Sequence, residues 1–163
     1  MQEMIIPNSG NSSGYYSYFI QAITPEDYNP INDTTTFVVH IYYQFGDVLI
    51  NEIMYEPETD EAEWVELINQ TDSDIKLDNW SILDKDEWEA TDSIFTHNLK
   101  SRDFVVITDR KSDDYLIQSD FPSLNNSGVD VYLFDPTGKM IDHVRFDNSW
   151  GGSNGFSLER ITY

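Results

Sequence analysis

Three glutamates are the first residues in this chain whose types and spacing could do chemistry. Glu52 falls in a predicted strand at 48–55. Glu63 immediately precedes the next predicted strand, at 64–69, and Glu66 lies within it. Carboxylates on neighbouring strands can serve as general acid and base, or can bind a cation. The alternative is that they are outward residues of half-exposed strands. We favour this alternative, because Glu66 alternates with apolar neighbours.

An acidic segment, DKDEWE at residues 84–89, is the densest group of oxygen ligands in the chain. A calcium loop needs six or more oxygens on a sharply turned backbone. The segment has no glycine at its sixth position and no terminal glutamate at the right offset, so it is not an EF-hand. It stays open as an irregular Ca²⁺ site. Asp92 and the stretch 109–114 are weaker candidates of the same kind.

The three histidines, His40, His97 and His143, do not show the spacing of a metal site. Asp142 precedes His143 in a predicted strand, where successive side chains point to opposite faces and do not converge easily. The glycine-rich stretch 151–155 leads into a predicted strand, so it offers no helix N-terminus for an anion. With no nucleophile motif either, we predict a non-enzyme without catalytic residues, cofactor or metal site.

The charge balance narrows the partners. Thirty acidic and nine basic residues give a net charge of -21 and a pI near 4.1. Such a polyanion repels phosphate backbones, so nucleic acid and anionic membranes are poor partners. The charge suits solubility outside a cell and attracts cations. No run of about 18 apolar residues is present, so we expect no membrane insertion.

Aromatic residues in loop-like stretches suggest where contacts could form. Trp88, Tyr115 and Trp150 lie between predicted strands. Exposed aromatic rings can stack on sugars or on protein partners. The alternative is that they are partly buried under the loops, which is the commoner fate of tryptophan.

Short alternating runs between turn signals predict an all-β fold from residue 47 onward. The expected strands lie at 48–55, 64–69, 80–84, 103–109, 130–135, 140–146 and 156–161. The sequence DPTG at 135–138 predicts a tight turn between the fifth and sixth of these. The side chains expected in the core are Val65, Leu67, Ile75, Leu77, Trp80, Ile82, Phe104, Val106, Val131, Leu133, Ile141, Val144, Phe156 and Leu158.

Residues 1–46 have a different character. They contain no lysine or arginine, and two aromatic and β-branched runs, 15–23 and 34–45, predict a hairpin. Two strands alone are only marginally stable, so we read 1–46 as a fragment resembling the end of a preceding fibronectin- or immunoglobulin-like domain. Its unpaired edges make a homodimer by strand pairing plausible. The first residues lack the pattern of a signal peptide, so we expect the chain to begin inside a longer protein.

Six landmarks in order resemble one family. They are INEIMYEP at 50–57, EWVELIN at 63–69, LDNW at 77–80, KSRDFVVITD at 100–109, LNNSGVDVYLFD at 124–135 and GFSLER at 155–160. Together they are similar to the lamin-tail domain family, and we assign residues 47–163 to such a domain. The family usually has glycine before the tryptophan. Here Asn79 takes that place, and asparagine tolerates a left-handed backbone better than most residues.

The resemblance implies an immunoglobulin-like β-sandwich used as a non-catalytic module. Similar animal domains end nuclear filament proteins, and similar bacterial domains occur in secreted or surface proteins, often beside hydrolases or nucleases. This chain lacks a heptad rod and a basic nuclear-localisation cluster, which favours the bacterial extracellular type. We expect it to space neighbouring domains of its parent chain or to contact a protein or polysaccharide surface. Two alternatives stay open, a calcium-dependent accessory module and a fragment of a hydrolase or nuclease whose catalytic domain is absent.

Overall fold

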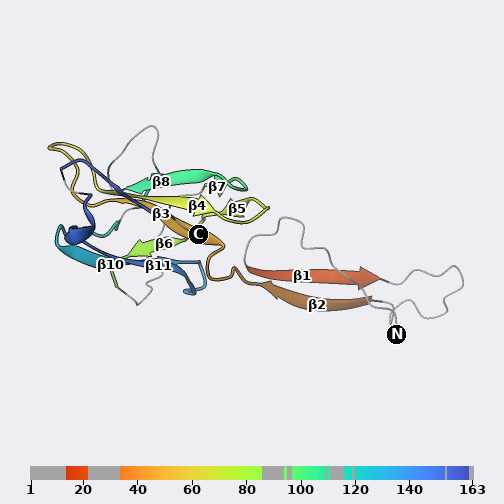
Figure 1. Cartoon of the computed structure of the whole chain (residues 1–163). Helices are drawn as coiled ribbons and strands as arrows, with labels where there is room; N and C mark the ends of the chain where they lie inside the picture. Colours follow the sequence, from red (N-terminus) through yellow and green to blue (C-terminus); the bar gives the residue numbers. More distant parts are fainter. Residues whose placement is uncertain are drawn as a thin grey trace, which may run out of the picture. The chain divides into compact units, whose positions relative to one another are not determined.

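The computed structural model describes residues 14–21, 34–85, 94, 97–108, 110, 116–118, 120–152 and 154–161. The chain divides into two compact units, one spanning Asn11–Tyr42 and one that includes Tyr43–Tyr163. Each unit is described by itself below (Figure 1).

The first unit is the expected N-terminal hairpin. Strand β1 (Gly14–Gln21) pairs antiparallel with β2 (Thr34–Ile41). Tyr18 lies opposite Phe37, and the two rings stack with centroids 5.4 Å apart. The other face carries Phe19 and Val38, which are 66% and 60% exposed. This hairpin therefore presents apolar side chains to solvent.

The second unit is an all-β sandwich, in agreement with the predicted fold class. Its larger sheet has the order β12-β3-β4-β8-β9, with bounds Leu158–Glu159, Val48–Met54, Trp64–Asn69, Phe104–Thr108 and Leu116–Ile117. The smaller sheet has the order β11-β10-β6, with bounds Met140–Asp147, Gly128–Phe134 and Ser81–Leu83. The two sheets form the two layers in Figure 1, and every strand pair in them is antiparallel except β8–β9.

Two shorter features complete this unit. A two-stranded sheet joins β5 (Ile75–Lys76) and β7 (Asn98–Leu99), which the alternation did not predict. A 3-10 turn, η2 (Asn148–Trp150), follows β11, with the Asp147 carboxylate accepting a hydrogen bond from the Ser149 amide at 2.8 Å. No α-helix occurs among the described residues.

The core between the sheets contains most of the predicted side chains. Those confirmed as buried are Val65, Leu67, Ile75, Leu77, Trp80, Ile82, Val131, Leu133 and Ile141, and Val144 and Leu158 pack against them as partly buried residues. Ile50 and Ile53 both enter the core although they are three residues apart. A β-bulge makes this possible, because the pairing with β4 shifts between Ile50 and Glu52 and leaves Asn51 as the extra residue.

Three core predictions were wrong, two of them in β8. In β8, Phe104 is 45% exposed, whereas Val105 and Ile107 are buried. The register with β4 places these two opposite Leu67 and Val65, and residues directly opposite share a face. Because side chains alternate along a strand, Val106 lies on the opposite face from Val105 and Ile107 and is only partly buried.

Phe156 was also predicted to be buried and is 73% exposed. The closing strand β12 is only two residues long and begins at Leu158. Gly155 turns the backbone with a φ of +81° just before Phe156, so this ring precedes the pleated part of the strand. The predicted strand at 156–161 is correspondingly shorter in the structure.

The predicted turn at 135–138 does join β10 and β11. The Gly138 amide donates to the Asp135 carbonyl at 3.0 Å, and Gly138 has a φ of +79°. The Asp135 carboxylate accepts from the amides of Thr137 at 2.8 Å and Lys139 at 3.1 Å. Aspartate at the first position of a turn makes this kind of side-chain bond.

Candidate functional site

Three glutamates form a row across the outer face of the larger sheet. Glu159 on β12 lies opposite Glu52 on β3, and Glu52 lies opposite Glu66 on β4. We call these three residues the glutamate row. The Asn51 side-chain amide donates to Glu66 Oε1 at 2.7 Å, and the Ser157 hydroxyl donates to Glu52 Oε1. Like charges directly opposite one another destabilise a sheet unless something compensates them.

This crowding perturbs one member of the row. Partial burial raises the pKa of the Glu66 carboxyl above its ordinary value, and the charges of Glu52 and Glu159 raise it further, while the hydrogen bond from Asn51 lowers it. The uptake of a proton or the presence of a nearby positive charge would therefore stabilise the glutamate row.

The structure brings together two of the three glutamates that the sequence singled out. Glu52 and Glu66 do lie side by side, but Glu63 belongs elsewhere. Its Oε2 accepts a hydrogen bond from the Leu124 amide at 2.8 Å. Glu159 was missed, and the only signal for it was its position in the closing strand.

Glu63 lines a separate polar cleft of about 330 Å³, together with Tyr55, Glu56, Pro57, Glu61, Arg110, Ser123 and Asn126. The guanidinium of Arg110 donates a hydrogen bond to the Asp60 carbonyl at 2.6 Å. Because its Oε2 accepts a hydrogen bond from a backbone amide, Glu63 supports the loop after β9 while it lines the cleft.

A second buried carboxylate joins the two sheets. Asp142 on β11 is 1% exposed, and its Oδ2 accepts from Arg160 Nη2 at 2.6 Å and from the Ile50 amide at 2.7 Å. Arg160 Nε also donates to the Ile50 carbonyl at 2.9 Å. Burial raises the pKa of Asp142, although the Ile50 amide and the charge of Arg160 act in the opposite direction.

Asp142 and His143 have separate partners. His143 Nε2 lies 2.8 Å from Asp130 Oδ1, and its ring stacks on Tyr132 with centroids 4.4 Å apart. Asp142 instead pairs with Arg160. The two adjacent side chains therefore make different contacts on β11.

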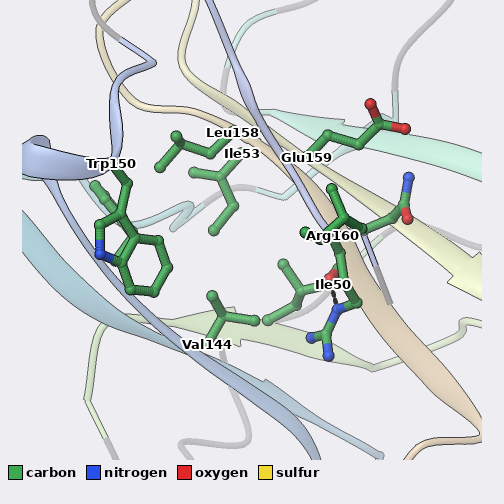
Figure 2. Close-up of a pocket in the computed structure, with 10 residues that line it drawn as sticks. Ile50, Ile53, Val144, Trp150, Leu158, Glu159 and Arg160 are labelled. Carbon is green, nitrogen blue, oxygen red and sulfur yellow. Dashed lines mark hydrogen bonds between the residues drawn. The ribbon is translucent and has the colours of Figure 1, made fainter. Parts of the chain in front are cut away.

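An apolar groove opens between β11 and β12, with a volume of about 450 Å³. Its lining comes from both sheets and from η2, and consists of Ile50, Asn51, Ile53, Val144, Phe146, Trp150, Leu158, Glu159, Arg160 and Ile161. Figure 2 shows Trp150 at one end of the groove and Glu159 and Arg160 at the other, with aliphatic side chains between them. Trp150 is 62% exposed. Of the two possibilities left open for this loop tryptophan, exposure and partial burial, the structure therefore shows exposure.

The glycine-rich stretch shapes this groove. A Cβ on Gly152 would lie 2.7 Å from Leu158 Cγ and 3.0 Å from the Tyr55 ring. The Tyr55 hydroxyl donates to the Gly151 carbonyl at 2.5 Å, and the Tyr55 ring stacks on Phe146 at 4.8 Å. Glycine lets the loop approach Leu158 closely, which holds that side chain in the groove wall.

Several sequence candidates lie outside the described residues. Of the acidic segment 84–89 only Asp84 and Lys85 are described, and Asp92, Trp88, Tyr115, Asp109 and the side chain of His40 are not. Among the residues that the structure does describe, no group of three histidine or acidic side chains is placed to hold a metal ion. Within the same residues, no helix has the length and apolar character needed to span a membrane.

The two layered sheets, with a buried tryptophan between them and an ion pair that bridges them, form a β-sandwich domain of the immunoglobulin-like class. The chain matches the Lamin Tail Domain family over residues 43–148 and belongs to that family. No curated protein matches the chain. The matched stretch ends before Trp150, so η2 contributes its tryptophan, and β12 its groove residues, from beyond the matched region.

Proposed function

We propose that this lamin tail domain is a non-catalytic interaction module of a larger secreted or cell-surface bacterial protein. In that role it spaces neighbouring domains or contacts a protein or polysaccharide surface. The observation that carries the proposal is the open groove, because an exposed tryptophan beside an apolar hollow is typical of a binding surface rather than of a core. The strongly acidic composition supports an extracellular setting.

The roles of three carboxylates support a module without catalysis. Asp142 joins the sheets, Asp135 caps a turn and Glu63 binds a loop amide. Each of these side chains already accepts hydrogen bonds that the fold requires.

Deletion of residues 43–163 from the parent protein tests this function. We expect the truncated parent to lose its retention on the outer surface of the producing cells, measured by protease accessibility on intact cells. Turnover of a small soluble substrate by any remaining catalytic domain should be unchanged. Unaltered retention together with lost turnover would contradict the proposal.

A second proposal concerns the hairpin, which we infer pairs with a second copy of this chain. Phe19 and Val38 share its exposed apolar face, and β1 and β2 each pair on one side in the part of the chain that the structure describes. The two strands contain no lysine, arginine or acidic residue, so the charge of the rest of the chain opposes pairing least here.

A further inference from the structure

We propose that the groove between β11 and β12 binds an extended peptide in which basic side chains alternate with apolar ones. This inference rests on the proposed interaction function, and it names the site and the chemical class of the partner. The apolar side chains would enter the hollow against Val144, Leu158 and Trp150. The basic side chains would face the glutamate row. Both halves of this site include residues beyond the matched stretch 43–148, namely Trp150 and Leu158 in the groove and Glu159 in the glutamate row.

The shape of the groove suits an extended chain. β11 is the edge strand of the smaller sheet and β12 the edge strand of the larger one, as far as the described residues go. An added strand can bond to such an edge through its main chain, while alternate side chains point to one side. The groove volume of about 450 Å³ fits a small number of aliphatic side chains.

Charge decides among the possible occupants. Glu159 lines the groove and begins the glutamate row, whereas the cation in the lining, Arg160, is already bonded to Asp142 at 2.6 Å. The rim is therefore negative. A second copy of this chain would bring another net charge of -21 against it, which opposes self-association at this site. A neutral polysaccharide would leave the row uncompensated, and a lysine or arginine would compensate it.

The first experiment measures fluorescence anisotropy of a labelled peptide of about eight residues, alternating lysine and valine, titrated with the whole chain. Two matched peptides separate charge from burial, one alternating lysine and glycine and one alternating glutamate and valine. We expect the lysine–valine peptide to bind about 10-fold more tightly than either control peptide. Equal binding of the lysine–glycine peptide would overturn the inference, because attraction to a polyanion alone would then explain the signal.

Variants locate the binding. Trp150→Ala and Glu159→Gln should each weaken the lysine–valine peptide about 3- to 10-fold. Phe156→Ala and Glu61→Gln are matched controls, since these residues are an exposed aromatic and an exposed acid that do not line the groove. We expect both controls to bind as the original chain does. All four residues carry exposed or rim side chains, so thermal melts should confirm that every variant is folded.

Other results would separate this inference from the proposed function. Trp150-dependent binding to cellulose, chitin or peptidoglycan without peptide binding would overturn the peptide assignment and would support an interaction module of another kind. Trp150-dependent self-association in sedimentation equilibrium, again without peptide binding, would assign the groove to a second copy and overturn the inference. If deletion of residues 43–163 abolishes surface retention but Trp150→Ala leaves it unchanged, the module function would stand. The groove would then have no part in that function.

Discussion

Arg160 Nη2 lies 2.6 Å from Asp142 Oδ2, and this ion pair links the end of β12 in the larger sheet to β11 in the smaller one. The same Asp142 oxygen accepts from the Ile50 amide on β3. The Asp142 side chain is 2% exposed and that of Arg160 is 25% exposed. The Asp142 carboxylate is therefore the more buried charge, and it depends on Arg160 to compensate it. The contact fixes the open edge of the sandwich beside the groove.

Replacing Arg160 by methionine should destabilise the domain by about 3 kcal/mol at pH 7, because the change leaves a buried carboxylate without its cation. Urea denaturation measures this loss. Arg102→Met is the matched control. Its pair with Asp72 has side chains 56% and 91% exposed, and we expect a change below about 0.5 kcal/mol.

The same variant has a predicted pH dependence. Burial already raises the pKa of Asp142, and loss of the Arg160 charge removes one of the influences that lower it. The variant's deficit relative to the original chain should therefore be complete above the raised pKa and shrink as the pH falls through it, when Asp142 takes up a proton. A deficit that stays constant from pH 7 to pH 4 would show that the lost arginine packing, and not the buried charge, causes it.

Glu66→Gln should stabilise the domain at pH 7. The raised pKa of Glu66 means that its contribution to stability is fully present below the unfolded value near 4.5 and is lost as the pH rises through the folded value. Glutamine removes the repulsion in the glutamate row and keeps an oxygen for the Asn51 amide. We expect a gain of about 0.5 kcal/mol, after discounting for solvent screening, that disappears by pH 4. An equal gain at both pH values would rule out this electrostatic origin.

The fold could be predicted from the sequence because most strands alternate clearly. Val65, Glu66 and Leu67 assign the faces of β4 without ambiguity. The sequence FVVIT of β8 is apolar at four of its five positions, so alternation cannot choose its inward face. Only the register with β4 makes that choice. The placement of Phe104 could therefore not be read from the local pattern.

The candidate site was only partly predictable for a related reason. Glu52 and Glu66 come from consecutive strands, and a hairpin-like pairing of neighbours is the usual expectation. Glu159 joins them through β12, which pairs with β3 from the opposite end of the domain. The ion pair of Asp142 with Arg160 depends on the same long-range closure. The spacing of residues in the local sequence does not indicate contacts of this kind.

Alanine at Gly128 should be one of the most damaging small substitutions. The residue opens β10 with a φ of +114°, and an added Cβ would lie 2.5 Å from the Phe146 carbonyl oxygen and 2.7 Å from Asp147 Cα. Gly151→Ala is the matched control, because its φ is +95° with nothing within 4 Å of the added atom. We expect a cost of about 1 to 2 kcal/mol for the control, and about 2 kcal/mol more at Gly128. Similar losses in chemical denaturation would contradict this reading of the strand contact.

Thermal melts with calcium test the accessory-module alternative. If the domain works without a specific cation, millimolar CaCl₂ should move the unfolding midpoint no further than MgCl₂ at equal concentration, with EDTA as the reference. Both salts screen the net charge of -21 alike, whereas a specific site stabilises the folded state by about 2.7 kcal/mol at 100 times its dissociation constant. A shift with calcium alone would revive the acidic segment 84–89 as a site.

Removal of residues 1–42 should abolish self-association and leave the sandwich folded. The second unit has its own core, including Tyr43 and Trp80, whose rings lie 4.9 Å apart. We therefore expect residues 43–163 to unfold cooperatively as a monomer, while the whole chain reaches the mass of a dimer in light scattering at micromolar concentration. Phe19→Lys should dissociate that dimer, because it places a charge on the exposed apolar face of the hairpin, whereas Ser17→Lys on the same face controls for added charge without lost apolar area. If the 43–163 fragment dimerises as well as the whole chain, the hairpin is not the contact surface.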